Sequence, residues 1–218
     1  MLEAEVDSLT PSRPFSRRDF VAASVGSGFA AAVLPVSAQT IKTPTDGLIA
    51  RTIGIPTESG FTLPVYGAVP GDPGRYPVVL VISEIFGVHE HIADVARRFA
   101  KQGYMAIAPE MFVRQGDAKA YTEIPKLINE VVSKKPDAEA LADLDAAVAW
   151  AAAHGGNTTK LGVTGFCWGG RITWLYAAHN PKVKAGVAWY GRLVGDPTAN
   201  TPRHPVDRAY ALHAPVLG

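Results

Sequence analysis

One short passage of the sequence combines a nucleophile with the small residues that would expose it. Cys167 is the central residue of Gly-Phe-Cys-Trp-Gly (165–169), between an apolar run at 160–166 that predicts a strand and a helix predicted at 169–179. A strand that turns this sharply into a helix strains the residue at the bend, and glycines two positions before and after it avoid a collision. The pattern is that of a nucleophile elbow with sulfur in place of the serine oxygen.

A helix that begins beside Cys167 would favour attack by its sulfur. The dipole and the free N–H groups of the first helical turn stabilise a thiolate relative to a thiol, so we expect Cys167 to ionise readily. The backbone N–H of Trp168 would face the oxyanion that forms when sulfur attacks a carbonyl. The alternative for a lone cysteine is a buried structural thiol. The order of strand, elbow and helix favours the nucleophile.

A carboxylate follows another buried strand. The run Tyr76–Ile82 is continuously apolar, which predicts a strand covered on both faces of a parallel sheet. Glu84 comes directly after this run, where a carboxylate is costly to desolvate unless it has a partner or a task. Because ligands bind beyond the carboxyl ends of strands in open parallel sheets, we expect Glu84 and Cys167 at one site. The alternative is a helix-capping or solvated glutamate.

The remaining hydrophobic patterns predict an α/β fold with a mostly parallel sheet covered by helices on both faces. Strands alternate with amphipathic helices along most of the chain, and only the first two strands are expected as a hairpin or edge pair. The predicted strands are 48–55, 61–69, 76–82, 104–109, 160–166, 183–190 and 214–218, and the predicted helices are 92–102, 136–154 and 169–179.

Three segments of the sequence carry a family resemblance. In order, they are Ser-Glu-Ile-Phe-Gly-Val (83–88), Ala-Pro-Glu-Met-Phe-Val-Arg (108–114) and Gly-Phe-Cys-Trp-Gly-Gly (165–170). They resemble the ordered motifs of the dienelactone hydrolase (carboxymethylenebutenolidase) family, in the α/β-hydrolase superfamily, from residue 48 to the end of the sequence. The resemblance implies hydrolysis of an ester or lactone bearing a carboxylate, through a cysteine nucleophile and an acyl-enzyme, with no cofactor or metal.

The resemblance also implies roles for residues around the cysteine. Glu84 would hold the resting thiol and swing away when substrate arrives, and the N–H of Ile85 would join that of Trp168 in the oxyanion hole. Arg114 would grip a substrate carboxylate, although a loop arginine is usually just solvated. Tyr190, at the end of a predicted strand, could line the substrate pocket, with packing at the core or rim as the alternative.

The family mechanism uses a Cys-His-Asp triad whose Asp and His fall beyond this sequence. The Asp follows the strand after the one that ends at Tyr190, and the His comes later still, whereas the sequence stops at Gly218, inside its last predicted strand. His204, in a Pro-rich loop, and His213, just before that strand, are not expected to replace the base. We therefore expect a C-terminally incomplete hydrolase domain, either a fragment of a longer enzyme or a truncated product whose turnover is severely impaired.

The first 38 residues predict an export leader. Ser-Arg-Arg-Asp-Phe-Val (16–21) resembles the twin-arginine motif; a run of small and apolar residues (22–34) and Val-Ser-Ala (36–38), a candidate cleavage site, follow. The run is too short and too rich in Gly and Ala for a stable membrane span. The hydrolase domain would occupy 39–218, and the twin-arginine machinery would export it to the bacterial periplasm or beyond.

Composition restricts the partners. The 21 basic and 20 acidic residues give a net charge of +1 without long runs of either sign, which argues against nucleic acid or anionic lipid and favours a small-molecule substrate. One cysteine excludes an intrachain disulfide and a thiolate-rich metal cluster. No histidines have a metal-ligand spacing that is typical of known motifs, and we interpret His89 and His91 as solvated residues at a helix start rather than as a metal pair.

Two other function classes stay open. The first is a non-catalytic or inactive binding protein on the same fold, which would have an unreactive thiol. The second is a thiol redox protein, which normally needs a second cysteine to resolve the disulfide. The single cysteine of this chain argues against the second class.

Overall fold

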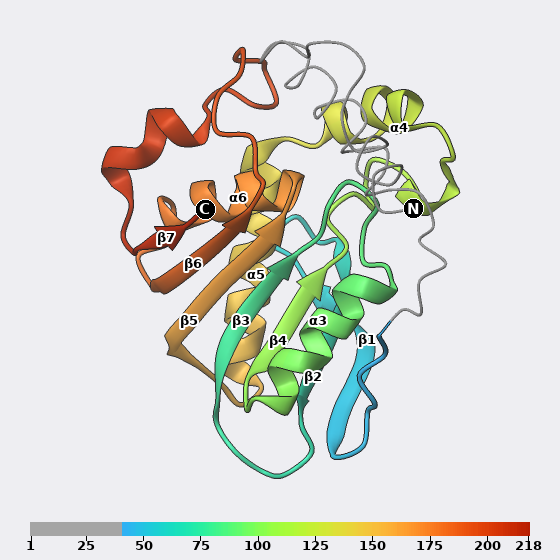
Figure 1. Ribbon diagram of the computed structural model, residues 1–218, viewed down its shortest axis with the longest axis vertical. Helices are drawn as coiled ribbons and strands as arrows, with labels where there is room; N and C mark the ends of the chain where they lie inside the picture. Colours follow the sequence, from blue (N-terminus) through green and yellow to red (C-terminus); the bar gives the residue numbers. More distant parts are fainter. Residues whose placement is uncertain (1–40) are drawn as a thin grey trace, which may run out of the picture. The chain divides into compact units, whose positions relative to one another are not determined.

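The computed structural model describes residues 41–218, and the predicted leader lies outside them. In this part of the chain a seven-stranded sheet has the order β1-β2-β4-β3-β5-β6-β7 (Figure 1). The strands are β1 (Leu48–Pro56), β2 (Thr62–Pro70), β3 (Tyr76–Ile82), β4 (Met105–Pro109), β5 (Gly156–Phe166), β6 (Val183–Trp189) and β7 (Val216–Leu217).

Helices cover both faces of this sheet. Helix α3 packs against β2, β3 and β4 on one face, whereas α5 and α6 pack against each other and against the other face (Figure 1). No helix within the described residues is long and apolar enough to cross a lipid bilayer. The α-helices are α3 (Glu90–Lys101), α4 (Ile124–Glu130), α5 (Asp137–Ala153) and α6 (Trp168–Ala177), and the 3-10 turns are η1 (Ala118–Ala120), η2 (Val132–Lys134) and η3 (Pro205–Ala211).

The strand directions confirm the predicted fold class. Strand β1 pairs with β2, and β2 with β4, in antiparallel fashion, while all pairings from β4 through β3, β5 and β6 to β7 are parallel. The centre of β3, from Val78 to Ile82, is buried because it has a strand on either side and helices above and below. Along this strand Val79 and Val81 pack under α3 with Ile92, Ala96 and Ala100.

Two parts of the fold differ from the sequence prediction. Strand β5 begins at Gly156 rather than Lys160, because Gly156 pairs with Tyr76 before the register shifts at Pro77 and Val78. The residues of this extension are mostly polar or exposed, so no apolar run marks it. Helix α4 lies in a segment for which the sequence predicts neither helix nor strand. Its single buried residue is Leu127, which is too little for a helical period to show.

A buried ion pair ties α6 to the start of α5. Both Nη atoms of Arg171 donate to the carboxylate of Asp137, at 2.6 and 2.7 Å, and Nη2 also donates to the carbonyl of Arg203 at 2.8 Å. The Arg171 side chain is buried. The pair joins the helix that presents Cys167 to the start of α5, which gives Arg171 a structural role.

Asp137→Asn should destabilise the protein by about 3–5 kcal/mol, because it leaves the buried Arg171 charge without its counter-ion. Urea unfolding followed by circular dichroism measures the change. The exposed pair of His179 and Asp145 (2.7 Å) supplies the matched control, since His179→Ala should cost about 1 kcal/mol or less. Equal, small losses in both variants would contradict a structural role for Arg171.

Candidate active site

Cys167 lies at a strained bend between β5 and α6. Its φ is +54° and its ψ is −112°, a backbone conformation that residues other than glycine rarely adopt. Its N–H donates to the carbonyl of Trp189 at 2.9 Å, and its carbonyl accepts from the N–H of Arg171 at 3.1 Å. The predicted sequence of strand, elbow and helix is therefore present, and the bend is held on both sides by backbone hydrogen bonds.

The glycines around Cys167 allow α6 to approach the sheet closely. A Cβ on Gly165 would collide with the carbonyl oxygen of Gly169, and a Cβ on Gly169 would collide with the carbonyl oxygen of Ile82 at the end of β3. A Cβ on Gly170 would meet the carbonyl oxygen of Trp189. The small residues thus serve the elbow as predicted, and they also bring the end of β3 against it.

The Cys167 thiol is protonated at neutral pH. Burial raises its pKa to about 11; the N–H of Trp168 acts in the opposite direction, and the charge of Glu84 adds to the rise. Our expectation that Cys167 would ionise readily is therefore wrong for this state. The helix start does supply a stabilising N–H, but the desolvation of sulfur and the nearby carboxylate outweigh it.

Glu84 and Tyr190 lie close to the cysteine. Glu84 acts on Cys167 through its charge, and its side chain is only 13% exposed. Tyr190 follows β6 with a φ of +40°. Partial burial of its hydroxyl raises the pKa of Tyr190 to about 12, and the charges of Glu84 and Cys167 add to the rise. The ends of β3, β5 and β6 thus bring three of the predicted residues together.

His89 is a member of this site that the sequence analysis missed. His89 lies at the start of α3 and its side chain is 36% exposed, as interpreted from the sequence. Its Nε2 also lies 3.0 Å from Oε2 of Glu84, a contact that the interpretation as a solvated residue did not include. His91 stacks on His89 with 6.1 Å between ring centroids. A histidine shortly after a carboxylate in one loop is the signal that could have suggested the pair. In the described part of the chain, no group of three or more His, Cys, Asp or Glu side chains could hold a metal ion.

Two backbone N–H groups are available as oxyanion donors. Trp168 is the first residue of α6, so its N–H has no acceptor within the helix, and it stabilises the Cys167 sulfur. Ile85 lies directly after Glu84 and is buried, and the hydrogen bonds found in residues 41–218 include none from its N–H. Their use as an oxyanion hole remains a prediction.

The segment after β4 contacts both the loop that carries Glu84 and the elbow that carries Cys167. Oε2 of Glu110 accepts from the N–H of Val88 at 3.0 Å, which ties it to the loop that carries Glu84. Phe112 packs against Trp168 with 4.6 Å between ring centroids. The three motif segments of the sequence therefore meet at the carboxyl ends of β3, β4 and β5, as expected for ligands of a parallel sheet.

Arg114 is engaged within the protein. Its two Nη atoms donate to the carboxylate of Asp143 at 2.7 and 2.8 Å, and its guanidinium lies 4.3 Å from the ring centroid of Phe61. The hydrogen bond to Asp143 raises the pKa of Arg114. A role in gripping a substrate carboxylate stays a prediction.

Two histidines are placed as the sequence suggested. His204 is buried, lies 3.5 Å from Nε of Arg171 and caps η3 together with Asp207. The N–H of His213 donates to the carbonyl of Ala177 at the end of α6, whereas Cys167 precedes the start of that helix. Neither His204 nor His213 has a hydrogen bond to the thiol among the described residues.

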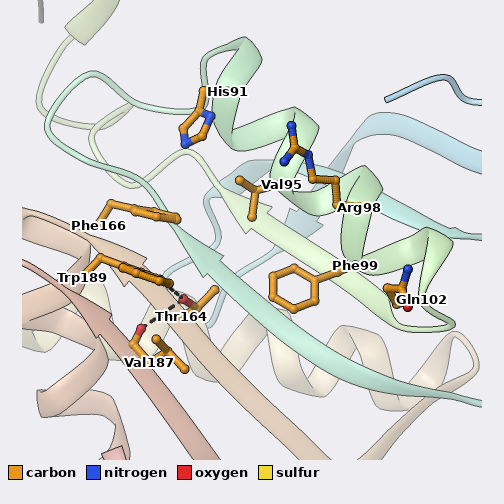
Figure 2. A pocket seen from close by; sticks show the side chains of 9 residues that line it. All are labelled: His91, Val95, Arg98, Phe99, Gln102, Thr164, Phe166, Val187 and Trp189. Atoms are coloured by element: carbon orange, nitrogen blue, oxygen red, sulfur yellow. Dashed lines mark hydrogen bonds between the residues drawn. The ribbon is translucent and has the colours of Figure 1, made fainter. Parts of the chain in front are cut away.

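An apolar cavity of about 410 Å³ is lined by α3 and by the ends of β5 and β6, on the face of the sheet that α3 covers. Figure 2 shows Phe166 and Trp189 side by side on this face, opposite His91 and Val95 of α3. The rings of Phe166 and Trp189 stack with 6.0 Å between centroids, and His91 meets Phe166 edge-on at 5.8 Å. The cavity therefore lies next to the strand ends that carry Cys167 and Tyr190.

Comparison with known proteins gives one consistent family. A family model described as the dienelactone hydrolase family matches residues 63–218. A protein of Methylorubrum extorquens (strain AM1) named "Putative carboxymethylenebutenolidase" is 58% identical in an alignment 218 residues long that covers 99% of this chain and 75% of that protein. A protein of the same name from Escherichia coli O157:H7 is 53% identical over 193 residues, 88% of this chain and 71% of that one.

A solved structure shows the same architecture. The crystal structure of "Putative Dienelactone Hydrolase" from Klebsiella pneumoniae is similar to this chain with a TM-score of 0.77 and 59% sequence identity. The similarity covers 78% of this chain and 71% of that one. The fold described above is therefore shared, over this aligned part, with a structure of closely similar sequence.

Gly165→Ala should destabilise the protein by roughly 1–3 kcal/mol or more, because the added methyl collides with the backbone of Gly169. Thermal and urea unfolding measure the loss. Gly162→Ala is the matched control in the same strand: its added Cβ would meet its nearest neighbour at 3.7 Å, so its stability should stay unchanged or rise slightly. Equal stabilities of the two variants would show that the elbow does not depend on this contact.

Proposed function

The chain belongs to the dienelactone hydrolase family, and from this premise we propose that it cleaves a lactone or ester by attack of the Cys167 sulfur on the carbonyl carbon. Membership of the family supports a hydrolase of lactones or esters. The placement of Cys167 supports the finer assignment. It lies at a strained bend, with the N–H of Trp168 against its sulfur, and this is the observation that carries the proposal.

The chemistry follows the elbow geometry. The thiol loses its proton to a base, and Sγ forms a bond to the carbonyl carbon while the carbonyl oxygen becomes an oxyanion. The N–H groups of Trp168 and Ile85 would donate to that oxygen. Collapse of the intermediate breaks the bond to the alcohol oxygen, which leaves as an alkoxide and takes up a proton. Water then cleaves the thioester and restores the thiol.

The Cys167 thiol is expected to be unreactive before substrate binds. With a pKa of about 11, Cys167 is almost wholly protonated at neutral pH, and such a thiol is a poor nucleophile. Glu84, whose charge contributes to that shift, is assigned to hold the resting thiol. Substrate binding would have to change the surroundings of Glu84 before sulfur could react, so reactivity would depend on the presence of substrate.

The relatives suggest the class of substrate. The name carboxymethylenebutenolidase describes the cleavage of an unsaturated lactone that carries a carboxymethylene group, and two relatives that are 58% and 53% identical to this chain over the aligned residues bear it. We therefore propose a carboxylate-bearing lactone or ester as substrate. Tyr190 is 65% exposed and lies close to Glu84 and Cys167, so it is available to line the pocket. No cofactor is needed for this reaction.

We also propose that residues 1–38 form a leader that directs the folded protein through the twin-arginine machinery to the periplasm. The motif at 16–21 and the small residues at 36–38 support this.

An activated aryl ester should acylate Cys167 and leave a thioester. In the 218-residue chain we expect one acyl group per molecule and slow turnover, because no histidine is hydrogen-bonded to the thiol in the described residues. Intact-mass measurement and peptide mapping locate the adduct, and phenolate release gives the rate. Cys167→Ala should lose the adduct and lower the rate at least ~100-fold, as expected for removal of a nucleophile.

His213→Ala, which removes an exposed imidazole at the other end of α6, is the control and should acylate like the unaltered protein. Acylation of lysines or of the N-terminus with Cys167 unmodified would sink the proposed mechanism. Complete absence of acylation, in a protein that still binds a carboxylate-bearing lactone, would favour the non-catalytic binding protein instead.

For the leader, simultaneous Arg17→Lys and Arg18→Lys should retain the protein in the cytoplasm of a bacterial host. Cell fractionation and the mass of the exported form measure the effect, with Arg13→Lys as a control outside the motif. Unchanged export of the double variant would show that another signal is used.

A further inference from the structure

The contact between Glu84 and His89 brings an imidazole into the site. Nε2 of His89 and Oε2 of Glu84 are 3.0 Å apart, and the two side chains are 36% and 13% exposed. Glu84 is thus largely removed from water, and at this distance the contact is a direct hydrogen bond. A hydrogen bond to a shielded carboxylate restrains its position much more than a contact on the open surface would.

The local backbone explains why His89 reaches Glu84. His89 occupies the N-cap position of α3, but its side chain makes no capping hydrogen bond. Gly87 has a φ of +73°, and the N–H of His89 donates to the carbonyl of Gly87 at 3.0 Å. This tight turn directs the chain back toward the end of β3. The imidazole therefore contacts the carboxylate instead of satisfying the helix start.

Packing restricts the imidazole further. The ring of His89 stacks on that of His91 with an angle of 19° between the planes, and His91 in turn meets Phe166 edge-on. Phe166 is the residue before Cys167. The loop is also fixed by Glu110, which accepts from the N–H of Val88. These contacts thus restrain the His89 ring in its position between α3 and the elbow.

We propose that His89 is a positioning residue for Glu84, which it holds at the end of β3 so that the carboxylate does not turn fully onto the Cys167 thiol. This inference rests on the proposed role of Cys167 and deepens it. The proposed reaction needs Glu84 to move away from the thiol. His89 gives the carboxylate a second partner, with which it can stay hydrogen-bonded after it has moved.

The other groups around Glu84 decide what loss of His89 would do. The titratable side chains that face Glu84 come from three segments: His89 before α3, Cys167 at the elbow and Tyr190 after β6. Glu110, on the segment after β4, is bound to Val88 and to Lys119. Without the imidazole, the thiol and the Tyr190 hydroxyl would be the remaining nearby groups able to donate to Glu84. The carboxylate would then stabilise the protonated thiol more strongly.

Alkylation of Cys167 by iodoacetamide tests this directly, because Cys167 is the single cysteine of the chain. The pH dependence of the rate gives the apparent pKa of the thiol, and it needs no ester hydrolysis. His89→Ala should raise that pKa, and alkylation at pH 9 should be about 3- to 10-fold slower, since one pKa unit changes the thiolate fraction tenfold. His89→Gln retains a donor and should stay close to the unaltered protein.

If His89 acts by positioning Glu84, the effect of His89→Ala on the alkylation rate must depend on the Glu84 carboxylate, whereas a general structural effect would not. Glu84→Gln should accelerate alkylation, and adding His89→Ala to Glu84→Gln should change nothing further, because the group to be positioned has lost its charge. His213→Ala controls for the loss of an imidazole elsewhere, and circular dichroism verifies folding.

A His89→Ala variant that reacts like the unaltered protein, or an effect that persists without the Glu84 carboxylate, would overturn the role of His89 alone. A native thiol that stays unlabelled up to pH 11, while the unfolded chain is labelled, would overturn the proposed nucleophile and this inference with it.

Discussion

The close approach of α6 to the ends of β3 and β5 is the constraint on which the rest of the site depends. Only glycine at 165 and 169 lets the backbone of the helix start lie against the two strands. This approach forces Cys167 to a positive φ and places Trp168 where its N–H meets sulfur. It also brings the end of β3, and with it Glu84, within the range of the thiol. A helix one methyl group farther away would separate these groups.

The same closeness sets two electrostatic effects against each other. A helix start favours an adjacent anion by only about 0.3–1 kcal/mol at an exposed site, whereas burial can shift a pKa by several units. At Cys167 burial is the larger effect and Glu84 adds to it, so the resting thiol has a pKa of about 11. A protonated thiol resists oxidation and unspecific alkylation. Such an arrangement suits the proposed nucleophile, which would become reactive only when a substrate rearranges its carboxylate neighbour.

The sequence revealed those features that depend on local spacing. The glycines around Cys167, the apolar run of β3 and the alternation of strands and helices predicted the elbow, the parallel sheet and the proximity of Glu84. The ionisation of Cys167 was predicted wrongly because it depends on burial and on a charge from another strand. The pairing of Arg114 with Asp143 and of Glu84 with His89 was missed for a related reason, since side-chain partners are set by the packing of loops that carry no periodic pattern.

The alternation of side chains along β5 and β6 connects the site with the far side of the sheet. Phe166 and Trp189 immediately precede Cys167 and Tyr190, and both line the apolar cavity beside α3. The N–H of Cys167 donates to the carbonyl of Trp189, so the two strand ends are joined at the bend itself. His91 contacts Phe166 from α3 and stacks on His89, which contacts Glu84. Because rings and backbone form one continuous set of contacts, the packing of that cavity and the geometry around Cys167 are coupled: a displacement of Phe166 or Trp189 would be passed on to the elbow or to the histidine that contacts Glu84.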